Sequence, residues 1–68
     1  LDSRGEVLSL SAAGNYLAVL YSDSLVIYTP QMEEYARLVG TEYARAVIMR
    51  DDGTAVLIGS ASAWLYIP

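Results

Sequence analysis

Short apolar segments recur along the chain, and each is bounded by glycine, proline or a cluster of small polar residues. The stretch from Gly14 to Pro30 passes through an apolar segment, a Ser-rich turn and a second apolar segment. The stretch from Gly53 to Pro68 follows the same plan. Gly14 and Gly53 lie one position farther apart than Pro30 and Pro68 do. We therefore predict an internal repeat whose second Ser-rich turn has lost a residue.

The apolar segments have the length and the residue types of β-strands. Residues 16–21 and 46–49 are continuously apolar, which predicts strands that are covered on both faces. Turn residues separate the segments, among them the Asp-Gly pair that favours a hairpin. The predicted strands cover residues 6–11, 16–21, 25–28, 45–49, 54–58 and 63–67.

Residues 31–38 fit two interpretations. Thr29 and Pro30 suit the start of a short helix, and apolar residues follow at helical spacing. Alternatively, residues 34–38 form an outer strand whose charged side chains protect the edge of a sheet. The repeat favours the strand, because it calls for a fourth strand at this place.

Units of about 40 residues with four short strands are typical of β-propeller blades. We therefore predict an all-β fold of antiparallel, propeller-like blades, with about one and three-quarter four-stranded repeats. Residues 1–68 would form a single fragment of such a domain, with repeat units at about 6–40 and 44–68. Neighbouring blades would cover both faces of each sheet.

The composition indicates that this chain shares its apolar surface with neighbours. The 68 residues are 54% hydrophobic and include no cysteine or histidine, so neither a disulfide nor a zinc site stabilises the small core. We expect self-association or contact with the remaining blades of a parent protein, and a protein partner is a further candidate. The net charge of −4 argues against nucleic acid and against an anionic membrane surface. The apolar runs are far shorter than the roughly 20 residues of a membrane helix.

Two stretches of the chain resemble known propeller families. Residues 9–20 and 25–28 resemble blades of the WD-repeat-like or quinoprotein-like kind, although the Trp-Asp and Gly-His pairs of true WD repeats are absent. Residues 47–59 and 63–68 are similar to the C-terminal end of an uncharacterised propeller-like family of Gram-positive bacteria. Members of that family typically carry an N-terminal membrane anchor and an extracytoplasmic β-rich domain. The resemblance implies an extracytoplasmic, soluble segment that forms the last blade and a half of a larger domain, and it implies no activity.

The residues that usually carry catalysis are missing. Without histidine, cysteine or lysine, the common bases, nucleophiles and metal ligands are absent. We therefore predict no enzyme activity, no cofactor and no metal. The remaining polar candidates are better explained as turn residues or solvated charges, and the arginines as partners of carboxylates. They are Ser60, Ser62, Glu33, Glu34, Glu42, Asp23, Asp51, Asp52, Arg4, Arg37, Arg45 and Arg50.

The aromatic residues are the best candidates for a binding surface. Tyr28 and Tyr66 each lie two residues before a proline, which favours packing between blades over ligand binding. Tyr35, Tyr43 and Trp64 are the candidates for an exposed partner or ligand surface, because Tyr and Trp are common anchors there. The leading hypothesis is a non-catalytic structural or protein-interaction module. The alternative is a carbohydrate or cell-wall ligand module that uses the exposed Tyr and Trp side chains.

Overall fold

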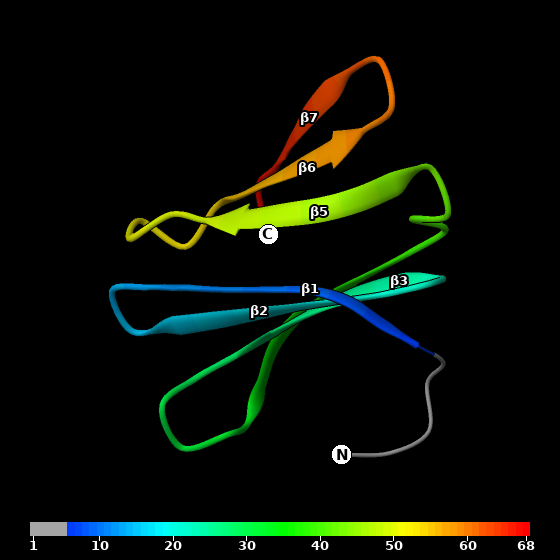
Figure 1. The fold of residues 1–68 in the computed structure, drawn as a ribbon. Helices are drawn as coiled ribbons and strands as arrows, with labels where there is room; N and C mark the ends of the chain where they lie inside the picture. Colours follow the sequence, from blue (N-terminus) through cyan, green and yellow to red (C-terminus); the bar gives the residue numbers. More distant parts are fainter. Residues whose placement is uncertain (1–5) are drawn as a thin grey trace.

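The computed structural model describes residues 6–68, and these residues form two antiparallel sheets and no helix (Figure 1). The first sheet has the order β1 (Val7–Ala13), β2 (Tyr16–Tyr21), β3 (Ser24–Tyr28) and β4 (Glu34–Val39). The second has the order β5 (Ala44–Met49), β6 (Ala55–Gly59) and β7 (Ala63–Tyr66). The predicted all-β class is confirmed.

The ambiguous segment is a strand. β4 pairs with β3 and lies at the edge of the first sheet, so the edge-strand interpretation is confirmed and the helical one is wrong. Its side chains alternate between exposed and partly buried positions, and Arg37 pairs with Glu34 at 2.6 Å. Charged residues at the edge of a sheet protect it against pairing with another chain.

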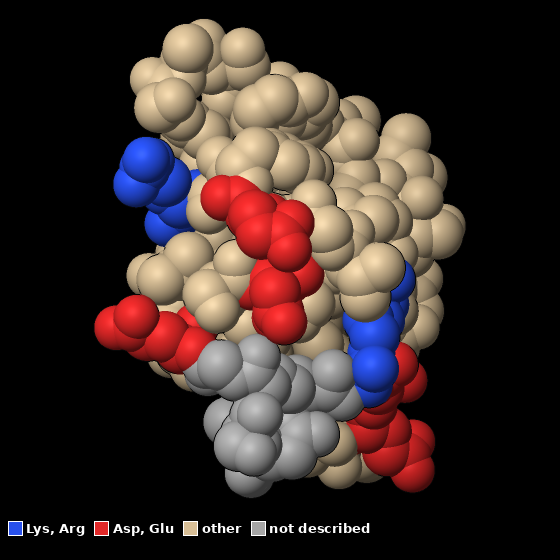
Figure 2. Space-filling view, turned by 90° about the vertical axis from the view of Figure 1, so that its right-hand side faces the viewer, with Lys and Arg blue, Asp and Glu red and all other residues tan. Residues whose placement is uncertain are grey.

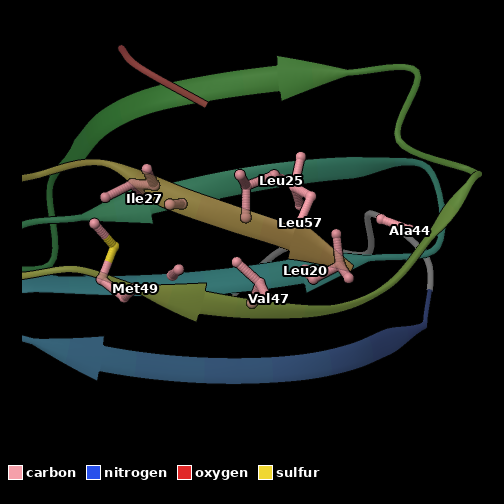
Figure 3. Packing of buried hydrophobic residues seen from close by; sticks show 9 residues of the cluster. Leu20, Leu25, Ile27, Ala44, Val47, Met49 and Leu57 are labelled. Atoms are coloured by element: carbon pink, nitrogen blue, oxygen red, sulfur yellow. The ribbon is translucent and has the colours of Figure 1, made fainter. Parts of the chain in front are cut away.

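The two sheets pack face to face, with β1 and β5 side by side (Figure 1). Between them lies the main core, in which Leu20 and Leu25 of the first sheet point toward Val47 and Leu57 of the second (Figure 3). These side chains are exposed by 3% or less. The complete buried cluster is Ala18, Leu20, Leu25, Ile27, Ala44, Val47, Met49, Ala55 and Leu57.

The two sheets differ in how many of their faces are buried. On the side of β2 and β3 that faces away from the second sheet, Val19, Tyr21, Val26 and Tyr28 form another buried cluster. The prediction that residues 16–21 are covered on both faces is therefore confirmed. The same prediction for residues 46–49 is wrong, because the side chain of Ile48 is 50% exposed.

The two sheets share an irregularity in their first hairpins. The pairing of β1 with β2 shifts by one residue between Val7 and Ser9, and that of β5 with β6 shifts between Ala44 and Ala46. A bulge of this kind is a defined structural feature, so its recurrence at the same point of both hairpins supports the predicted repeat.

The two sheets differ in length at the turn between their first two strands, and not at the Ser-rich turn as predicted. The Ser-rich turns are equally long, because the pair Leu20–Leu25 in the first copy matches Ile58–Ala63 in the second. The first hairpin closes on the pair Ala13–Tyr16, whereas the corresponding turn of the second copy is longer by one residue. The prediction of a residue lost in the second Ser-rich turn is therefore wrong, and Gly14 and Gly53 do not occupy equivalent positions.

Two serines of β1 join the sheets through hydrogen bonds to the backbone of β5. The N–H of Met49 donates to the Ser11 hydroxyl at 2.8 Å, and the N–H of Val47 donates to Ser9 at 3.3 Å. The hydroxyl of Tyr66 donates to the carbonyl of Arg37 in β4 at 3.2 Å. Tyr66 therefore packs between the sheets, as its place in the repeat predicts.

Candidate interaction surface

Two of the three predicted surface aromatics form a pair at one end of the second sheet. The rings of Tyr43 and Trp64 meet edge to face with centroids 4.3 Å apart, and each side chain is 42% exposed. Gly59 lies beneath them: a Cβ at this residue would come within 2.9 Å of both the Trp64 ring and the Tyr43 carbonyl. The absence of a side chain at Gly59 therefore allows the indole to lie against the strand.

We expect Gly59→Ala to disturb this pair. The added methyl overlaps a backbone carbonyl that cannot turn aside, so overpacking should lower the free energy of unfolding by about 1–3 kcal/mol. The Trp64 fluorescence emission should shift with it, and urea unfolding followed by that emission measures both effects. Ala63→Gly is a control that changes a neighbouring exposed residue; if its emission shift matches that of Gly59→Ala, the close contact is not the cause.

Tyr35 lies apart from this pair, in β4 of the first sheet. Its ring centroid is 4.9 Å from that of Tyr16, and the hydrogen bond with Tyr35 is the main reason why the pKa of Tyr16 is raised. The ring of Tyr16 also lies close to Gly53. The three predicted residues therefore do not form one site.

The predicted Asp-Gly hairpin turn uses its acidic side chain locally. The carboxylate of Asp52 accepts hydrogen bonds from the hydroxyl of Thr54 at 2.6 Å and from its N–H at 3.0 Å. These two bonds hold the pKa of Asp52 below its usual value, and the bond from the Thr54 hydroxyl has the larger effect. Within residues 6–68, no group of three or more acidic side chains is placed to hold a metal ion.

The lowered pKa makes the stability of this turn depend on pH. The folded chain favours the ionised carboxylate of Asp52. Its contribution to the free energy of unfolding is therefore complete above the pKa of the unfolded chain, about 3.9, and disappears as the pH falls through the lower pKa of the folded chain. We expect the difference in unfolding free energy between the wild type and Asp52→Asn to shrink as the pH falls through this range. Urea unfolding at several pH values measures it, and a difference that does not change with pH would contradict the assignment.

The other polar candidates lie in turns or on the surface. Ser60, Ser62 and Glu42 are exposed turn residues. The N–H of Glu33 donates to the Thr29 hydroxyl at 3.2 Å, while the Glu34 side chain is engaged by Arg37. The structure forms no pocket among the residues it describes. Arg4 lies outside these residues.

Six apolar side chains lie on the side of the second sheet that faces away from the first, with the exposed Arg45 of β5 next to them in sequence. Pairing places Ile48, Val56 and Leu65 in one row across the three strands and Ala46, Ile58 and Ala63 in the next. We call these six side chains the outer face. Ile48 and Leu65 are 50% and 52% exposed, and the other four are exposed or partly buried. Adjacent exposed apolar side chains of this kind mark interaction surfaces.

The free edge of β7 adjoins the outer face. Among the described strands, β7 pairs with β6 alone, whereas its counterpart β3 also pairs with β4. The N–H of Gly59 donates to the carbonyl of Ser62, which sets the alternation of the antiparallel ladder. The backbone groups of Ala63 and Leu65 therefore point away from β6 and are open to another strand.

The outer face was not predicted from the sequence. Its strands are apolar on both sides, so the alternation of residues cannot distinguish the exposed side from the buried one. The correct alignment of the two copies supplies the missing signal. Ile48 corresponds to Ser11 and Leu65 to Ile27, both on the face of the first sheet that contacts the second. The second copy presents the same face outward.

Within the described residues, no helix is long and apolar enough to cross a bilayer. Neither a family model, nor a curated protein, nor a solved structure matches this chain.

Proposed function

We propose that this chain is a non-catalytic structural and protein-interaction module built from two propeller-type units. One observation carries the proposal: two antiparallel sheets pack face to face, and the second keeps an apolar outer face and a free strand edge. A neighbouring sheet or strand that covers these groups removes apolar area from water and pairs open backbone groups. The module therefore works by holding neighbours together.

The wider setting of the module follows from the resemblance of residues 47–68 to the uncharacterised Gram-positive family. On that basis the two units are C-terminal blades of a larger extracytoplasmic propeller. Packing between the two sheets in this chain is the kind of contact that successive blades make. The fourth strand beside β7 would then come from outside residues 6–68.

An apolar fluorescent dye tests the proposed role. We expect the folded chain to bind the dye in dilute solution, and we expect its melting temperature to rise with its own concentration as association covers the surface. Circular dichroism confirms the β-structure in the same samples. A folded chain that binds no dye, with a melting temperature independent of concentration, would show that no such surface is available.

A second candidate function rests on the Tyr43–Trp64 pair. Both side chains are 42% exposed and held in a fixed edge-to-face arrangement, and aromatic rings of this kind stack on sugars. Titration with soluble cell-wall glycan fragments should then quench the Trp64 emission, and Tyr43→Ala should weaken the quenching. An unchanged emission at millimolar fragment would remove this candidate.

A further inference from the structure

The outer face is the repeat counterpart of the face through which the first sheet binds the second. We propose that it docks onto the same face of a second copy of this chain, across a two-fold axis. This proposal rests on the proposed interaction role and specifies its partner. In such a contact, Ile48, Val56 and Leu65 of one copy meet the same residues of the other.

The backbone chemistry of the first interface argues against a further unit stacked in the same manner. There, the hydroxyls of Ser9 and Ser11 accept the N–H groups of β5. The corresponding residues of the outer face are Ala46 and Ile48, which have no acceptor. A further β5-like strand would bury two unpaired N–H groups there, each of which carries a desolvation penalty.

A second copy brings no such groups. The N–H groups of Val47 and Met49 in each copy are already bonded to serines of the same chain. Two outer faces can therefore meet through apolar side chains alone. The N–H groups at the edge of β5 are therefore hydrogen-bonded within each copy, and the contact between copies leaves none of them unpaired.

A head-to-tail contact between copies would have little open apolar surface to use on one of its two sides. In that arrangement the outer face of one copy would cover the far face of the first sheet in the next, as the first sheet covers the second within one chain. The centre of the far face is already buried, since Val19, Tyr21 and Val26 are exposed by 2% or less, and only marginal residues such as Leu10, 62% exposed, remain open there. The two-fold arrangement avoids this obstacle, because it uses the outer face twice.

Charge does not oppose the contact, although the chain carries a net charge of −4. None of the six side chains of the outer face is ionisable. On the side of the molecule shown in the space-filling view, the uppermost part, at the height of the turn between β6 and β7, is uncharged, and charged side chains begin below it (Figure 2). Apolar association of this kind should depend little on ionic strength.

The size of the face sets the expected affinity. Three strands about 4.8 Å apart, each about 17 Å long, cover roughly 250 Å² in projection. Counted for both copies, this is well below the area of a standard specific interface, so association should be weak. We therefore expect a monomer–dimer equilibrium with a dissociation constant of about 10 µM to 1 mM.

Sedimentation equilibrium of the full chain, from about 5 µM to 1 mM, tests the contact. Ile48→Lys should raise the dissociation constant about tenfold or more, because each dimer would bury two uncompensated charges. Ile48→Ser copies the residue at the matching position of the first sheet and should weaken the dimer without disturbing the fold. Val39→Lys is the matched control: Val39 is a 70% exposed apolar residue of β4, outside the outer face. The dissociation constant of the Val39→Lys dimer should equal that of the wild type.

Cross-linking tests the two-fold arrangement. The chain has no cysteine, so Val56→Cys introduces a single thiol on the central strand of the outer face. Two such thiols should form a disulfide across the axis under mild oxidation, whereas Val39→Cys should remain largely monomeric.

A wild type that stays monomeric up to 1 mM, or a dimer equally sensitive to Ile48→Lys and Val39→Lys, would overturn the proposed contact. So would a dimer in which Val56→Cys cross-links no faster than Val39→Cys. In each case, binding of the apolar dye would leave the proposed interaction role standing with another partner. A folded chain that neither binds the dye nor associates would reject both.

Discussion

Replacing Leu57 by Ala is expected to lower the free energy of unfolding by about 2–5 kcal/mol. Leu57 is 1% exposed and lies in the main core, where it points toward Leu20 and Leu25 of the first sheet (Figure 3). Strand backbones on both sides limit the collapse of the resulting cavity, so the lost contacts are not replaced. A chain of this size has a total stability of roughly 3–10 kcal/mol, so the variant should be largely unfolded or close to its midpoint.

Urea unfolding followed by circular dichroism measures this loss. Leu65→Ala is the matched control, because it makes the same change on the same sheet at a side chain that is 52% exposed. In dilute solution, where the chain is monomeric, Leu65→Ala should cost less than about 1 kcal/mol. Equal losses for the two variants would show that the sheets do not pack through this core.

Local sequence features were sufficient to predict the strands. Turn residues such as Gly14 and Asp52 mark the ends of the apolar segments, and β-forming residues fill them. The fourth strand was correctly placed because the repeat required it, although its residues also suited a helix. Consistency between local preference and the repeat therefore settled a segment that local preference alone left open.

The exposure of the outer face could not be predicted in the same way. Ile48 and Leu65 lie in segments as apolar as those of β2 and β3, and period-two alternation gives no contrast when both sides of a strand are apolar. Which side is covered depends on how the sheets stack, which is a property of the whole chain. The turn glycines also misled the alignment, because Gly14 and Gly53 occupy different places in turns of different length.

Only two of the three residues predicted to form an aromatic surface lie together, for a related reason. Tyr43 and Trp64 are distant in sequence, and their contact depends on the side-chain-free surface at Gly59. Tyr35 shares their residue type, yet its strand lies in the other sheet and places it against Tyr16. Residue type identifies candidate binders, but pairing and stacking of strands decide which of them meet.

Removal of both β1 hydroxyls should be the second most damaging change. In Ser9→Ala/Ser11→Ala, the N–H groups of Val47 and Met49 lose their acceptors, while both residues remain 4% exposed or less. An unpaired buried donor costs about 1–3 kcal/mol, so the double variant should lose up to twice that amount. Ser11→Ala alone should cost more than Ser9→Ala, because its bond of 2.8 Å is shorter than that of 3.3 Å.

Urea unfolding gives the stability of these variants, and hydrogen exchange shows where the loss arises. The Met49 amide should exchange faster in Ser11→Ala than in the wild type, measured under conditions where global unfolding contributes little. Ser60→Ala is the control, because Ser60 is an exposed turn residue, and its effect should stay within about 0.5 kcal/mol. If Ser11→Ala behaves like this control, the serines do not satisfy the edge of β5, and the lack of hydroxyls at Ala46 and Ile48 would not prevent a further unit from stacking there.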